Sequence, residues 1–225
     1  MPWLRRLPHS TMWMQMDWPW HSVRQRCKKA RLAKPSERGL ISEHPLPEAI
    51  RVFYSEATMQ ITACPIALPL GKLSALAGVK FIAVHCSATR PTALMGVRDI
   101  HRMHIERGFA CIGYHYVIKR DGTIERGRPE DKMGAHVEGH NRDSLGVCLI
   151  GGIDADGKAV NNFTQQQFDS LRALLTSLHS KYPRAVIQGH RDFFGDSNGD
   201  GKIDSRDWLK ECPCFDVKSW WSAKP

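Results

Sequence analysis

The stretch "VKFIAVHCSAT", residues 79–89, opens with an apolar run that ends at a histidine. Valine, isoleucine and phenylalanine are enriched in strands, and a short continuous apolar run is typical of a buried strand. We therefore predict a buried strand over residues 79–85, with His85 at its carboxyl end. Cys86 follows directly and is predicted to point to the opposite face, where it packs as a small apolar residue.

Helix-like segments and a hairpin signal follow this strand. "GVRDIHRMHIERG" spaces its apolar residues as on one helical face and stops at Gly108, so we predict a helix that ends there. "TQQQFDSLRALLTSLHSKY" predicts a second helix, with Thr164 as N-cap and Gln167 three residues later as its capping-box partner. Between them, "YHYVIKRDGTIERGR" has two alternating runs around Asp121-Gly122, which predicts a β-hairpin.

Two more apolar runs complete the pattern. "SLGVCLIGG", residues 144–152, predicts a buried strand in which Cys148 belongs to the core, and "AVIQGH", residues 185–190, predicts a short strand that ends at His190. Strands and helices alternate along this half of the chain. The sequence therefore predicts the α/β class: a single domain with a central mixed β-sheet flanked by helices.

The first 78 residues have a different texture. They contain eight of the 13 prolines and show no repeat or sustained periodicity. Their net charge is +6, against +3 for residues 79–225. We predict a poorly structured N-terminal extension over 1–78 and a domain over 79–225. The charge of the extension indicates either a solvated basic tail or an anionic partner such as nucleic acid, lipid headgroups or a cell-wall polymer.

The cysteine content and hydropathy restrict the cellular setting. Seven cysteines at irregular spacing are an odd number, so we predict free thiols and synthesis in the bacterial cytoplasm. No stretch reaches the roughly 18–20 apolar residues of a membrane span, and no signal peptide is visible. A monomer that reaches its site of action by a separate release route is expected.

Two histidines at strand ends suggest a metal centre. His85 and His190 each follow an apolar strand, and Cys212 lies further along, so the three form a candidate zinc set. Structural zinc takes four protein ligands whereas catalytic zinc keeps one position for water, so a set of three favours catalysis. From spacing alone, packed or solvent-facing histidines remain an alternative, and Cys214, across Pro213, competes with Cys212.

Five motifs in order carry a resemblance to a known family. They are "FIAVHCSAT", "GYHYVIKRDGTIERGR", "GAHVEGHNRDSLGVCLIGGID", "FTQQQFDSLRALL" and "KECPCFDVKSWW". Together they resemble the zinc-dependent N-acetylmuramoyl-L-alanine amidases of the phage-lysozyme/type-2 amidase family, which is also similar to the peptidoglycan recognition proteins. The resemblance covers residues 79–221.

The resemblance implies roles for six residues. His85, His190 and Cys212 match the zinc ligands, which favours Cys212 over Cys214; Tyr114 and Lys210 match the catalytic non-ligands; and His136 matches a substrate-binding position in the groove. Zinc would lower the pKa of its bound water to near ~7 and polarise the scissile carbonyl. Lys210 would then stabilise the oxyanion. Tyr114 would either donate a hydrogen bond to the tetrahedral intermediate or relay the proton of the water, and both roles stay open.

An acidic loop separates His190 from Lys210. "DSNGDGKIDSRD", residues 196–207, matches the register of a 12-residue calcium loop. The ligand positions would be Asp196, Asn198, Asp200, Lys202 through its carbonyl, Asp204 and Asp207. Asp207 is shorter than the usual glutamate, and a polar turn without metal is the alternative.

The sequence thus predicts a peptidoglycan hydrolase that resembles phage endolysins. It would cleave the amide between N-acetylmuramic acid and L-alanine, use Zn²⁺ and bind Ca²⁺ in the acidic loop. The alternative is a binding module of the same fold, directed at peptidoglycan or at a phage RNA polymerase. A nucleic-acid binder would rest on charge alone.

Overall fold

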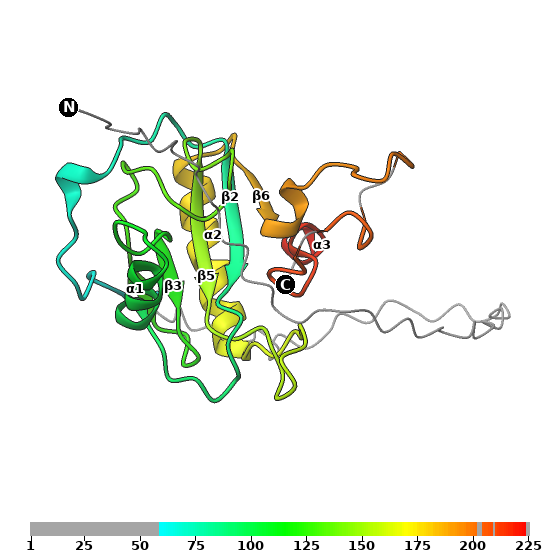
Figure 1. Ribbon diagram of the computed structural model, residues 1–225, viewed down its shortest axis with the longest axis horizontal. Coiled ribbons are helices and arrows are strands. Elements are labelled where there is room, and N and C mark those ends of the chain that lie inside the picture. Colours follow the sequence, from blue (N-terminus) through cyan, green and yellow to red (C-terminus); the bar gives the residue numbers. More distant parts are fainter. Residues whose placement is uncertain (1–58, 202–203, 209, 224–225) are drawn as a thin grey trace, which may run out of the picture. The chain divides into compact units, whose positions relative to one another are not determined.

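The computed structural model describes residues 59–201, 204–208 and 210–223, all of which belong to one compact unit, Phe53–Pro225 (Figure 1). Its strands are β1 (Ile61–Thr62), β2 (Phe81–Cys86), β3 (Tyr116–Ile118), β4 (Ile124–Arg126), β5 (Ser144–Leu149) and β6 (Val186–Gly189). Its helices are η2 (Leu70–Lys72), α1 (Val97–Glu106), α2 (Gln165–Lys181), η3 (His190–Phe193) and α3 (Val217–Ser222). Residues 1–58 of the extension predicted over 1–78 lie outside the described residues.

The strands form a mixed sheet in the order β1-β4-β3-β5-β2-β6. Only β3 and β4 pair antiparallel, and the other neighbours are parallel. The antiparallel pair is the predicted hairpin, whose turn residue Gly122 has a φ of +84° and donates its N–H to the Lys119 carbonyl at 2.9 Å. The predicted α/β class with a mixed sheet is confirmed.

The sheet begins upstream of the boundary predicted at residue 79. β1 pairs with the edge strand β4, Leu73 is buried, and Ala75 forms a bridge with Lys132. Sequence periodicity missed β1 because two residues are too few to show an alternation.

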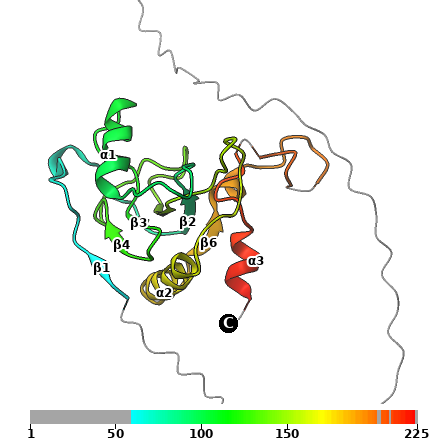
Figure 2. The same cartoon turned by 90° about the horizontal axis from the view of Figure 1, so that it is seen from below.

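Helices cover both faces of the sheet, as Figure 2 shows for α1 and α2. The α2 leucines Leu171, Leu174, Leu175 and Leu178 pack with Ile82 and Val84 of β2. Val97 and Ile100 of α1 pack on the other face with Cys148 of β5. Because side chains alternate along a strand, His85 lies on the α1 face and Cys86 on the α2 face.

Helix α2 begins as predicted. Thr164 Oγ1 accepts the Gln167 N–H at 3.1 Å, and Gln167 Oε1 accepts the Thr164 N–H at 3.1 Å. The buried Gln167 side chain also donates to the carbonyls of Ile118 and Ile150, at 3.1 and 3.0 Å, and so joins the helix to two strands. Among the described residues, none of the helices is long and apolar enough to cross a membrane.

Candidate metal centre

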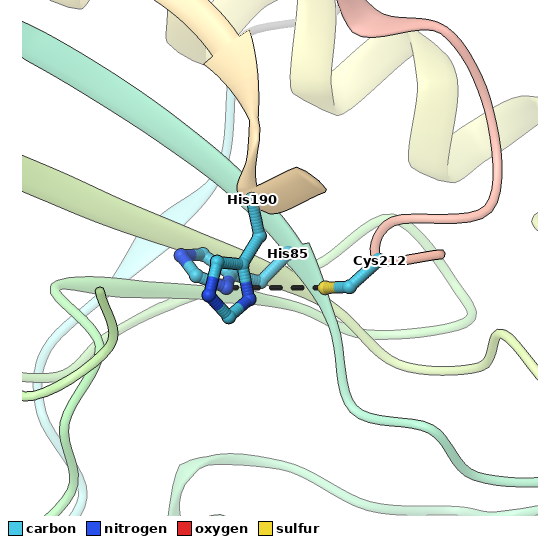
Figure 3. A group of neighbouring side chains, drawn as sticks. All are labelled: His85, His190 and Cys212. Carbon is cyan, nitrogen blue, oxygen red and sulfur yellow. Dashed lines mark hydrogen bonds between the residues drawn. The ribbon is translucent and has the colours of Figure 1, made fainter. Parts of the chain in front are cut away.

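The first two predicted ligands stand at the ends of neighbouring parallel strands. β2 and β6 are paired up to Val84 and Gly189, so His85 and His190 follow this last pair side by side at the carboxyl edge of the sheet. His85 is still paired there with Cys148 of β5. Their ring centroids lie 4.6 Å apart. Figure 3 shows the two rings beside Cys212, with a dashed line from His85 to the sulfur, and Cys212 comes from the loop that precedes α3.

Hydrogen bonds hold this loop against β2 and η3. The Cys212 carbonyl accepts the N–H of Arg191 at 2.9 Å, and its Sγ accepts the N–H of Cys86 at 3.2 Å. Sγ lies 3.9 Å from Nδ1 of His85. One donor atom from each of His85, His190 and Cys212 lies within 4.8 Å of the other two.

The other cysteine of the Cys-Pro-Cys sequence points away. Cys214 Sγ lies 3.2 Å from the Gly152 carbonyl, which it contacts as a donor, and 3.8 Å from Cys86 Sγ. The contact with Cys86, together with burial, raises the pKa of the Cys214 thiol. The structure therefore groups Cys212 with the histidines and excludes Cys214.

The chemistry of this donor set fits zinc. Burial lowers the pKa of His85 well below its ordinary range, and burial with the nearby charge of Lys210 lowers that of His190 to about 4. Both rings are therefore neutral at pH 7, which is the form that binds a metal. Zn–S bonds of about 2.3 Å and Zn–N bonds of about 2.0 Å place a sulfur and a nitrogen ligand of a tetrahedral zinc roughly 3.5 Å apart. The distance between Cys212 Sγ and His85 Nδ1 is 3.9 Å.

The two predicted catalytic residues lie beside this set. The ring of Tyr114 is 5.1 Å from that of His85, and burial raises the pKa of its hydroxyl. Lys210 is exposed, and its positive charge lowers the pKa of both His85 and His190. A phenol that stays protonated and a cation therefore flank the three donors.

His136 contacts a ligand candidate directly, which sequence analysis did not foresee. Its Nδ1 lies 3.1 Å from Nε2 of His85, and the two rings meet edge to face at 5.0 Å. The predicted groove position gave no signal of this contact, because the two residues are 51 positions apart.

The remaining nearby histidines have structural partners. His104 Nδ1 accepts the N–H of Gly113 at 2.8 Å. His115 Nδ1 accepts the N–H of Gly146 at 2.9 Å, and its Nε2 lies 2.9 Å from the Lys132 carbonyl, which it contacts as a donor. Tyr114, the residue before His115, places its ring next to that of His85.

The acidic loop uses its carboxylates internally. Asp196 accepts the N–H groups of Gly199, Asp200 and Gly201, and Asp207 accepts those of Ser197, Asn198 and Asp204. The Arg206 guanidinium lies 2.5 Å from Asp200 and 2.7 Å from Asp204. Lys202 lies outside the described residues. Within the described part of the chain, His85, His190 and Cys212 are the group placed to hold an ion, and calcium stays a prediction.

Comparison with known proteins gives consistent matches. A family profile described as N-acetylmuramoyl-L-alanine amidase matches residues 75–212. The endolysin of Escherichia phage T7 is 47% identical over 140 residues, which is 62% of this chain and 83% of the endolysin. Peptidoglycan-recognition protein SC2 of Drosophila melanogaster is 29% identical over 111 residues, 48% of this chain and 57% of that protein.

Solved structures show the same fold. The N-acetylmuramoyl-L-alanine amidase LysC from Clostridium intestinale URNW superimposes with a TM-score of 0.54 at 28% identity. The match covers 70% of this chain and 91% of LysC.

Proposed function

This chain belongs to the N-acetylmuramoyl-L-alanine amidase family and is a peptidoglycan hydrolase, and we propose that it uses a zinc ion held by His85, His190 and Cys212. The bond cleaved joins N-acetylmuramic acid to L-alanine of the stem peptide. One observation carries the zinc proposal: three donor atoms of the residue types that bind catalytic zinc lie within 4.8 Å of one another.

Zinc supplies a Lewis acid and a water nucleophile at neutral pH when bound. Two neutral imidazoles and one thiolate would leave this centre with a net charge of +1. The positive charge of Lys210, whose effect reaches both histidines, is suited to stabilise the oxyanion that develops on the scissile carbonyl. The protonated hydroxyl of Tyr114 favours the role of a hydrogen-bond donor to that oxyanion over the role of a base.

The matched pair Cys212→Ala and Cys214→Ala tests the proposal. Purified cell walls are incubated with each protein, free L-alanine amino termini are counted, and zinc is measured in the same samples. We expect wild type and Cys214→Ala to bind zinc and release L-alanine termini, and Cys212→Ala to lose both. Equal release by wild type and Cys212→Ala would refute the zinc mechanism.

A peptidoglycan-binding role without cleavage is the second candidate, favoured by the likeness to peptidoglycan-recognition protein SC2. The same assay separates the two functions. Protein that sediments with cell walls but releases no L-alanine termini would identify a binding module.

Action on the cell wall after release from the cytoplasm is part of the proposal, as is contact between the basic residues and anionic wall polymers. Binding of a phage RNA polymerase and binding of calcium are predictions outside this proposed function.

A further inference from the structure

The two ring nitrogens of His85 face different partners. Nδ1 lies 3.9 Å from Cys212 Sγ, on the side of the three donors, and Nε2 lies 3.1 Å from Nδ1 of His136. A nitrogen that binds a metal carries no proton, so the single proton of a neutral His85 belongs on Nε2. Nε2 then donates, Nδ1 of His136 accepts, and the proton of His136 belongs on its own Nε2.

The fold gives the His136 ring a built slot. A Cβ on Gly146 would lie 2.7 Å from its Cγ and Cδ2, and a Cβ on Gly134 would overlap its Cδ2 and Nε2. The backbone is held as well, because Asn141 Oδ1 accepts the N–H groups of His136 and Val137 at 2.7 and 3.0 Å. The slot therefore directs Nδ1 at His85.

Apart from a backbone hydrogen bond with Ser144, the His136 ring has His85 as its hydrogen-bonding partner in the described part of the chain. Nε2 of His136 is buried and has no hydrogen-bond partner there. His115, whose ring lies 5.6 Å away, has both nitrogens engaged by backbone groups of Gly146 and Lys132. Among these residues, His85 is thus the side chain that shares a hydrogen bond with the His136 ring.

We infer that His136 is a positioning residue of the metal centre, which accepts a hydrogen bond from His85 and thereby holds His85 with Nδ1 directed at the ion. This inference rests on the proposed zinc function. It gives His136 a role in supporting the ligand His85, in addition to the substrate-binding position in the groove that the sequence predicted. Outer partners of this kind orient metal-binding histidines and set their tautomer.

Two substitutions of similar size separate the hydrogen bond from the packing. His136→Asn places a carbonyl oxygen near the position of Nδ1, whereas His136→Leu places a methyl group there. Zinc affinity is measured by competition with a chelator of known affinity, and circular dichroism verifies folding. We expect His136→Leu to bind zinc about 10- to 100-fold more weakly, and His136→Asn to stay close to wild type.

A third variant and a spectrum extend the test. Gly146→Ala pushes the ring from its slot without changing its nitrogens, and should weaken zinc binding in the same direction as His136→Leu. In ¹⁵N spectra of the zinc-loaded protein, His85 should carry its proton on Nε2 in wild type and in His136→Asn.

Each alternative result is decisive. Equal zinc affinity for wild type, His136→Asn and His136→Leu would overturn the inference, and a raised KM alone would place His136 on the substrate. If wild type binds no zinc, both the proposed zinc function and the inference fail. If wild type binds zinc and the variants bind it equally well, only the inference fails.

Discussion

Cys212 and Cys214 are two positions apart in the sequence, but their sulfur atoms lie in different surroundings. Cys212 Sγ accepts the Cys86 N–H and lies near His85, whereas Cys214 Sγ contacts Cys86 and the Gly152 carbonyl. The sequence left the choice between them to the family resemblance. The geometry makes the same choice for a physical reason, since only one of the two sulfurs lies among the other donors.

Tyr114 offers a test of catalysis at the scale of one hydroxyl. Tyr114→Phe keeps the ring that packs 5.1 Å from His85 but removes the donor. We predict that kcat falls about 10²- to 10³-fold, as for loss of one oxyanion donor, while zinc content stays at the wild-type level.

The matched control is Tyr116→Phe, because the Tyr116 hydroxyl bonds Glu130 away from the centre. Its kcat should equal that of wild type. A Tyr114→Phe enzyme with unchanged kcat on a soluble muropeptide would show that the hydroxyl takes no part in the reaction.

At the scale of elements, local signals predicted the two longest helices, α1 and α2. Helix α1 ends next to Gly108, whose φ is +83°, and α2 starts at the predicted N-cap Thr164. These features depend on neighbours in the chain, so sequence reveals them. The short helices η2, η3 and α3 were not predicted, because segments of three, four and six residues are too short to show helical periodicity.

The loop over 196–207 carries the calcium prediction. Without an ion, Arg206 neutralises Asp200 and Asp204, so calcium must compete with its guanidinium. We predict that micromolar free calcium raises the Tm of wild type, and raises that of Arg206→Ala further. A calcium-selective chelator should reverse the shift while zinc stays bound.

Asp196→Ala removes the first ligand position and is the matched control, for which calcium should leave the Tm unchanged. Wild type and Arg206→Ala that both show no shift would identify the loop as a polar turn.

At the scale of the whole molecule, buried histidines couple folding to pH. Burial is the main cause that lowers the pKa of His104 and of His115 to about 4, and neither residue is a candidate ligand. In the unfolded chain both titrate near 6.5. Below that pH the unfolded state binds more protons than the folded state, so the free energy of unfolding decreases as the pH falls.

This contribution to stability is present in full above about pH 6.5 and is lost as the pH falls toward 4, by on the order of 3 kcal/mol for each histidine. We therefore predict that the metal-free protein unfolds at lower urea concentration at pH 5 than at pH 7.5. His104→Asn keeps an acceptor for the Gly113 N–H and cannot titrate, so its stability to urea should change less with pH than that of wild type. If the urea midpoint of both proteins falls equally with pH, His104 does not contribute to the pH dependence.

The sequence by itself determined the α/β class, the buried strands that end at His85 and His190, the hairpin, the capping of α2 and, through five ordered motifs, the family. These features depend on short-range propensity, periodicity and recognisable motifs. Only the tertiary structure decided that β1 joins the sheet, that Cys214 turns away from the centre, and that His136 contacts His85. Such contacts join residues 51 or more positions apart, and packing of the whole domain brings them together, which no local pattern encodes.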